Sequence, residues 1–230
     1  MLELFPEGFQ EVEHTDGVEL VAYTDPGGEE RLWQAFGRAH AEDVTADWHE
    51  RWKEFHRPVR VGSLWIGPPW SEPPTDATAV VIDPGRAFGT GAHPTTRLCI
   101  ELLLGLQPGS LVDLGCGSGV LGIAAAKLGF GPIIALDADA NAVAAAGTNA
   151  AANGVVLTAQ RVDVLVDELP SADIAVANIT WPVLATVVTR LRCRWLVSSG
   201  YLASEASSLP PFQHVRRVAR DGWAADLHRA

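Results

Sequence analysis

The sequence predicts an α/β fold built on a doubly wound, mainly parallel sheet, with a small α+β domain in front of it. Three observations support this prediction. Strand-like and helix-like segments alternate from about residue 110 onwards, which is typical of a parallel sheet with helices on both faces. A glycine-rich turn follows the first of these strands. The last two strand-like segments are joined by Asp221-Gly222, a hairpin signal, so the sheet should end in an antiparallel pair.

The N-terminal part reads as a small α+β module. Strands are expected at 9–13 and 18–23, because β-rich runs flank the turn signal Asp16-Gly17. Residues 29–36 have helical spacing, with their apolar side chains on one face. A second helix is expected at 47–55, because Trp48, Trp52 and Phe55 form an amphipathic stripe that Pro58 ends.

A strand at 59–66 and a proline-rich stretch at 67–77 follow. The stretch is interpreted as a linker between a first module at 1–66 and a second domain at 78–230. In that domain, helix patterns and strand patterns alternate. The expected helices are 96–104, 120–128, 140–153 and 183–191, and the expected strands are 110–112, 133–136, 155–162, 173–177, 195–199, 214–219 and 223–228. A sheet that is parallel until a final hairpin has the order of the seven-stranded Rossmann-like methyltransferase sheet, which ordinary dehydrogenases lack.

The glycine-rich turn indicates a nucleotide site. The motif D-L-G-C-G-S-G at 113–119 follows the apolar run 110–112, and Asp137 ends a second apolar run, 133–136. Strand, glycine turn, helix, strand and acid describe a nucleotide-binding βαβ unit. An acid two residues before the first glycine would crowd a pyrophosphate, but it suits a cationic amino-acid group. Asp113 therefore favours S-adenosylmethionine as the ligand.

Two alternatives remain open from the motif alone. Gly117, Gly119 and Gly122 also spell G-x-G-x-x-G, with Asp137 at the distance that a dinucleotide fingerprint requires. An NAD site is therefore the competing interpretation, and a glycine turn without any ligand is the third. The short chain of 230 residues leaves little room for a separate dehydrogenase substrate domain.

Composition limits the class of protein and its partners. Apolar residues make up 47% of the chain, no stretch has the length of a membrane span, and the N-terminus lacks a signal-peptide pattern. A cytoplasmic protein without membrane contact is expected. The three cysteines and seven histidines form no metal-ligand pattern, so no metal is expected. Residues 1–75 carry fifteen acids against six bases, a surface that repels nucleic acid and attracts basic partners.

Three segments together resemble a known family. They are I-D-P-G-R-A-F-G-T-G-A-H-P-T-T-R at 82–97, V-D-L-G-C-G-S-G-V-L at 112–121 and V-A-N-I at 176–179. This pattern is similar to that of the PrmA family, bacterial methyltransferases of the eleventh protein of the large ribosomal subunit. The lysine methyltransferases of the electron-transfer flavoprotein β-subunit look similar too. The resemblance implies that residues 1–66 are a substrate-recognition module, a truncated form of the family's ferredoxin-like N-terminal domain.

The resemblance also implies residue roles. Gly115 lets backbone approach the methionine end of the cofactor, Asp113 supports the network around its ammonium, and Asp137 accepts the ribose hydroxyls. Asn178 is the expected catalytic residue, whose side-chain carbonyl orients the incoming amine. For Asp163 a contact to adenine and a plain loop role remain equally open. The full set of expected cofactor-binding residues is Phe88, Thr96, Asp113, Gly115, Gly117, Asp137, Asp163 and Asn178.

The implied function is an S-adenosylmethionine-dependent protein N-methyltransferase. Its substrate would be a lysine or an N-terminal amine of a basic ribosomal protein of the L11 type. Methylation of another protein lysine or of a small amine remains an alternative, and an NAD-binding oxidoreductase is a further one. For His93, Thr95 and Arg97, helix capping and surface hydrogen bonding compete with a role in the site.

Overall fold

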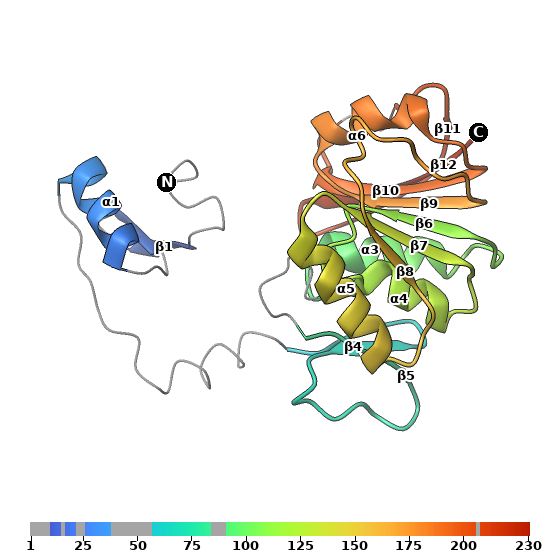
Figure 1. Ribbon diagram of the computed structural model, residues 1–230, viewed down its shortest axis with the longest axis horizontal. Coiled ribbons are helices and arrows are strands. Elements are labelled where there is room, and N and C mark those ends of the chain that lie inside the picture. The colour runs from blue at the N-terminus through green and yellow to red at the C-terminus, as the bar shows by residue number, and fades with distance from the viewer. Residues whose placement is uncertain (1–9, 15–16, 22–25, 38–56, 84–90, 206–207) are drawn as a thin grey trace. The chain divides into compact units, whose positions relative to one another are not determined.

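The computed structural model describes residues 10–14, 17–21, 26–37, 57–83, 91–205 and 208–230. The chain divides into two compact units, Met1–Arg51 and Trp52–Ala230, which are described separately (Figure 1). The helix expected at 47–55 and the cofactor contact expected at Phe88 lie outside the described residues. No helix in the described ranges is long and apolar enough to cross a membrane.

The described part of the first unit comprises a hairpin and one helix. Strands β1 (Gln10–His14) and β2 (Gly17–Val21) pair antiparallel, with Gln10 opposite Val21 and His14 opposite Gly17. The expected hairpin is thus confirmed. Helix α1 (Pro26–Phe36) begins three residues earlier than expected. Proline is favoured at this position, because the N–H groups of the first helical turn have no partner within the helix, so no hydrogen bond is lost.

A seven-stranded sheet forms the centre of the second unit. Its order is β11-β12-β10-β9-β6-β7-β8. All neighbours pair parallel except β12, which is antiparallel to both β10 and β11. This is the order expected for the methyltransferase sheet, and it confirms the predicted fold class. The strands are β6 (Leu111–Leu114), β7 (Ile133–Asp137), β8 (Thr158–Arg161), β9 (Ile174–Asn178), β10 (Trp195–Leu202), β11 (Gln213–Arg220) and β12 (Trp223–Arg229).

Helices cover both faces of this sheet, as the alternation of segments predicts (Figure 1). One face carries α3 (Pro94–Leu103), α4 (Val120–Lys127) and α5 (Ala140–Ala152). The other carries α6 (Trp181–Val187) with the short 3₁₀ helix η1 (Val188–Arg190). The central strands β6 and β9 are buried almost throughout, so burial of their apolar side chains between the helix layers stabilises the sheet.

A second, three-stranded sheet precedes α3. Strands β3 (Val59–Val61) and β4 (Leu64–Gly67) form a hairpin, and β5 (Thr78–Val81) pairs parallel with β4. The single strand expected at 59–66 is therefore wrong, because Gly62 adopts a φ of 58° and turns the chain. The stretch 67–77 connects two strands of one sheet, and the two compact units divide at Arg51 instead.

Two asparagines, Asn149 of α5 and Asn153 at its C-cap, attach β5 to the main sheet layer. Asn153 Oδ1 accepts the N–H of Val81 at 2.8 Å, and Asn153 Nδ2 donates to the Val81 carbonyl at 2.6 Å. Asn149 accepts the N–H of Asp83 at 3.1 Å and donates to the Ser118 carbonyl, in the glycine-rich turn, at 3.0 Å. Asn149 is 3% exposed and Asn153 is 8% exposed. Both side chains therefore bond to backbone of the segment that contains β5, and they hold it against α5.

We expect Asn153→Ala to lower the free energy of unfolding by about 2–3 kcal/mol, because it leaves both backbone groups of Val81 unpaired. Urea unfolding measures this loss. Thr148→Ala is the matched control, since Thr148 is exposed on the same helix and bonds only to the helix carbonyl of Ala144. Equal stability of the two variants would contradict the anchoring role of Asn153.

Candidate active site

The candidate residues gather where the parallel strands end. Leu114 at the end of β6 pairs with Leu136 of β7 and with Ala177 of β9. The residues that follow these positions therefore meet at one edge of the sheet. They are the glycine-rich turn, Asp137 and Asn178. In open α/β sheets this carboxyl edge is where ligands bind.

The glycine-rich turn is held by Asp137. The N–H of Gly117 donates to Asp137 Oδ2 at 2.9 Å, and the N–H of Asp139 donates to Oδ1 at 3.0 Å. Gly115, Gly117 and Gly119 have φ values of 68°, 52° and 81°, which favour glycine. Each Asp137 oxygen accepts one backbone bond, and a carboxylate oxygen has a second lone pair. The half-buried carboxylate therefore keeps capacity to accept hydroxyl groups.

Asp113 lies behind the turn. It is 1% exposed, and its Oδ2 accepts the N–H of Gly122, in the first turn of α4, at 3.0 Å. Burial raises the pKa of Asp113 to about 7, against the opposing effect of that hydrogen bond. Asp113 thus fixes the start of α4 relative to β6. Its predicted support of a ligand ammonium stays a prediction.

This raised pKa makes stability depend on pH. Between about pH 4 and pH 7 the folded state keeps a proton that the unfolded state has lost, so the free energy of unfolding falls as pH rises. Asp113→Asn cannot ionise and retains an acceptor for Gly122. We expect the variant to gain about 3 kcal/mol relative to the parent between pH 4 and pH 8. Urea unfolding across this range measures the gain, and parallel pH profiles of the two proteins would contradict it.

The structure brings Asn178 and Thr96 together across 82 positions of sequence. Asn178 Nδ2 donates to Thr96 Oγ1 at 3.4 Å, and Thr96 is 2% exposed. This contact uses the amide nitrogen of Asn178 and leaves its carbonyl oxygen as an acceptor. His93 caps α3, because its Nδ1 accepts the N–H of Thr95 at 3.3 Å. Capping is thus the observed contact of His93, and burial lowers its pKa.

Asp163 follows β8 and organises its own loop. Its Oδ1 accepts the N–H of Leu165 at 2.9 Å, and its N–H donates to Asp167 Oδ2 at 2.8 Å. The structure thus shows the loop role that the sequence left open. The predicted adenine contact stays a prediction.

The chemistry of the site fits a cationic nucleoside better than a diphosphate. Asp113, Asp137 and Asp163 bring carboxyl groups to the strand ends, and Thr96 and Asn178 add neutral polar groups. None of these five side chains is cationic. Diphosphates are commonly bound by positive charge or by helix N-terminal N–H groups, and here a carboxyl group, that of Asp113, accepts one N–H of the first turn of α4. The residues present therefore fit a positively charged ligand that carries hydroxyl groups.

Three contributors to this region were not predicted as site residues. Asn149 bonds to the glycine-rich turn through the Ser118 carbonyl, while Gly200 lies close to the backbone of Ile179, the residue after Asn178. A buried asparagine within an alanine-rich helix was the available signal for Asn149. Ile179 ends the V-A-N-I segment, but neither it nor Gly200 carried a signal of its own, because their contact joins parts of the chain that are distant in sequence. No cluster of three or more His, Cys, Asp or Glu within the described ranges could hold a metal ion.

The strand order and the glycine-rich turn at the carboxyl edge define the class as a Rossmann-like methyltransferase fold. The profile of the family described as ribosomal protein L11 methyltransferase (PrmA) matches residues 12–224. The chain therefore belongs to the PrmA family. This confirms the resemblance that the sequence motifs indicate.

Similar proteins agree with this membership. A ribosomal protein L11 methyltransferase of Methylococcus capsulatus is 41% identical over 218 residues, covering 85% of this chain and 71% of the relative. Another, of Pasteurella multocida, is 44% identical over 178 residues, and the match spans 71% of this chain but only 59% of the relative. The crystal structure of a ribosomal protein L11 methylase from Lactobacillus delbrueckii superposes with a TM-score of 0.66 at 28% identity, covering 75% of this chain and 98% of that one.

Proposed function

We propose that this protein transfers methyl groups from S-adenosylmethionine to lysine or N-terminal amines of a ribosomal protein of the L11 type. The observation that carries the proposal is the edge of the methyltransferase sheet where the parallel strands have their carboxyl ends. Acidic and neutral polar side chains surround a glycine-rich turn there. Membership of the PrmA family supports the choice of substrate. The excess of acids in residues 1–75 suits a basic protein partner.

Four groups would hold the methyl donor. Asp137 would accept its ribose hydroxyls through the lone pairs that the backbone leaves free. The glycine-rich turn around Gly115 and Gly117 would lie along its amino-acid part, with Asp113 supporting that turn from behind. Thr96 would contact it from the start of α3. Asp163 is proposed for the adenine side, as the next carboxylate along the strand ends.

The donor, when bound, supplies a sulfonium methyl group with an excellent leaving group. The protein's own task is then to align a neutral amine with that methyl group, and such alignment can contribute about 7–11 kcal/mol. We assign the orientation of the amine to the free carbonyl oxygen of Asn178, because Thr96 occupies its nitrogen. No protein base is assigned, and the proton leaves to water.

The amine must first lose a proton. A lysine with a pKa near 10.4 costs about 4–5 kcal/mol to deprotonate at pH 7. Desolvation of the amine beside the half-buried Asn178 lowers this cost, because burial disfavours the ammonium form.

Methyl transfer from labelled S-adenosylmethionine into a bacterial lysate tests this proposal, followed by identification of the labelled protein. Label in a ribosomal protein of the L11 type is the expected result. Label confined to other proteins or to small amines would refute the substrate, and the absence of any protein or small-molecule label would refute the activity.

A further inference from the structure

Strand β10, which pairs with β9 as far as Asn178, contains a bulge. In β10, Ser199 pairs with Ala225 of β12 and Tyr201 pairs with Ala224, so Gly200 is an extra residue without its own partner. Gly200 has a φ of 100°. Bulges re-aim the neighbouring chain and occur next to active sites. This bulge directly follows the position where β10 pairs with Asn178.

Gly200 lets the backbone of Ile179 come unusually close. A Cβ at Gly200 would lie 2.3 Å from the Ile179 oxygen, 2.7 Å from its carbonyl carbon and 2.9 Å from its nitrogen. Only a residue without a Cβ permits this approach. The N–H of Ile179 also donates to the Ser199 carbonyl at 3.1 Å. Ile179 is therefore fixed through its backbone from the β10 side.

The other side of Ile179 faces the glycine-rich turn. Its Cγ2 lies 2.6 Å from where a Cβ on Gly115 would be, and no other atom of the described residues comes that close. Ile179 is thus packed between two glycines, one in the turn and one in the bulge. Because Asn178 is the preceding residue, any movement of Ile179 also moves Asn178.

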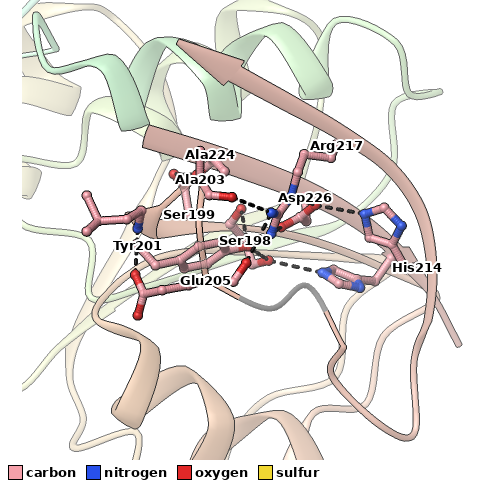
Figure 2. Close-up of polar contacts among 11 residues, drawn as sticks. Ser198, Ser199, Tyr201, Ala203, Glu205, His214, Arg217, Ala224 and Asp226 are labelled. Carbon is pink, nitrogen blue, oxygen red and sulfur yellow. Dashed lines mark hydrogen bonds and ion pairs between the residues drawn. The ribbon is translucent and has the colours of Figure 1, made fainter. Parts of the chain in front are cut away.

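A polar network around the buried Asp226 holds the bulge in place (Figure 2). Asp226, which is 0% exposed, accepts hydrogen bonds from Tyr201 Oη at 2.8 Å and from His214 Nε2 at 2.7 Å. Arg217 donates to both carboxylate oxygens, from Nε at 2.9 Å and Nη2 at 2.8 Å. Burial alone would raise the pKa of Asp226, but these hydrogen bonds outweigh it and hold the pKa below its usual value.

The network reaches the site residues through Tyr201. The Tyr201 ring packs edge-on against Trp181 at 5.2 Å between centroids, and Trp181 begins α6 just after Ile179. The Tyr201 hydroxyl also contacts Ser198 Oγ at 2.8 Å. Tyr201 therefore connects the ionised Asp226 to both chain segments that adjoin Ile179.

We propose that Ile179 is a positioning residue that sets Asn178 relative to the glycine-rich turn, held in place by the Gly200 bulge and the Tyr201–Asp226 network. The proposal rests on the function proposed above. It adds that Gly200 and Tyr201 affect the transfer step through Ile179 without contacting either substrate.

The test compares two new Cβ atoms. The Cβ of Gly200→Ala would clash with the backbone of Ile179, and the Cβ of Gly115→Ala would clash with its side chain. Gly200→Ala is expected to lower kcat on the order of 10-fold to 100-fold, because a small misplacement of reacting groups has effects of this size. Adding Ile179→Ala should not restore it, since the clash is with Ile179 backbone. Gly115→Ala should weaken adenosylmethionine binding. Adding Ile179→Ala should recover part of the lost affinity, because that change removes the clashing Cγ2 while the φ of 68° at position 115 stays unfavourable for alanine.

Gly222→Ala is the matched control for backbone strain. Gly222 has a φ of 78°, but a Cβ there would meet no atom of the described residues within 4 Å. Its kcat should stay near that of the parent. Tyr201→Phe keeps the ring and removes the hydroxyl, and it should lower kcat about 5-fold with an unchanged cofactor Kd. This variant decides the proposal if Gly200→Ala does not fold.

The proposal is overturned if Gly200→Ala and Tyr201→Phe both keep the parental kcat, or if Ile179→Ala restores Gly200→Ala. Failure of the proposed function gives a different result. In that case the parent methylates no protein, but titration with adenosylmethionine still measures whether Ile179→Ala recovers part of the affinity that Gly115→Ala loses. If adenosylmethionine does not bind the parent, the midpoints of urea unfolding decide. Ile179→Ala must then restore part of the stability that Gly115→Ala loses, and it must restore none of the stability that Gly200→Ala loses. Any other result overturns the proposal.

Discussion

Replacing Asn178 by alanine is expected to lower kcat for methyl transfer on the order of 100-fold while leaving the Kd for S-adenosylmethionine within about 5-fold of the parental value. The physical reason is that the free carbonyl oxygen of Asn178 orients the amine, whereas most cofactor contacts come from the other strand ends. Initial-rate kinetics with the methylated protein and calorimetric titration of the cofactor measure the two effects separately.

Thr148→Ala, an exposed change on α5, is the control for this experiment and should keep both constants. An Asn178→Ala protein with parental turnover would show that Asn178 does not orient the amine. A large loss of cofactor affinity at parental kcat would instead make Asn178 only a cofactor contact.

Asp137→Ala is expected to weaken S-adenosylmethionine binding roughly 100-fold. Two hydrogen bonds from hydroxyl groups to a carboxylate are together worth about 3 kcal/mol, which corresponds to this factor. The substitution also releases the N–H of Gly117 from its contact at 2.9 Å and so loosens the glycine-rich turn. Isothermal titration of the variant and the parent with the cofactor measures the change.

Asp139 provides the matched control two residues away. It is exposed, and its carboxylate caps α5 by accepting the N–H of Asn141 at 2.9 Å. Asp139→Ala should therefore lower stability by about 1 kcal/mol and change cofactor affinity less than about 3-fold. If both variants lost cofactor affinity equally, the negative charge of the loop at 137–139 would recognise the ligand, and not Asp137 in particular.

The main sheet was predictable from sequence because its strands are short apolar runs between helices with clear periodicity. The central strands β6, β7 and β9 came out within two residues of the expected bounds. The region 59–77 was harder. Gly62 turns β3 back onto β4, and the prolines that resemble a linker lie in a connection within one sheet. A local pattern does not reveal that β5 pairs with β4.

The candidate site shows the same limit. Asp113, Gly115 and Asp137 were predictable because their spacing along one βαβ unit is local. The contact of Asn178 with Thr96 follows from the strand order, which brings α3 beside β9. The packing of Ile179 against Gly200 depends on a bulge, and nothing local in the sequence marks it. The network around Asp226 likewise joins residues from three strands.

The central claim is that the carboxyl edge of this sheet binds a positively charged methyl donor in preference to a dinucleotide. Parallel calorimetric titrations of the full chain with S-adenosylmethionine and with NAD test it most directly. Saturable binding of S-adenosylmethionine, weakened by Asp137→Ala, with no heat from NAD, is the predicted result. Saturable binding of NAD in preference to S-adenosylmethionine would contradict the account.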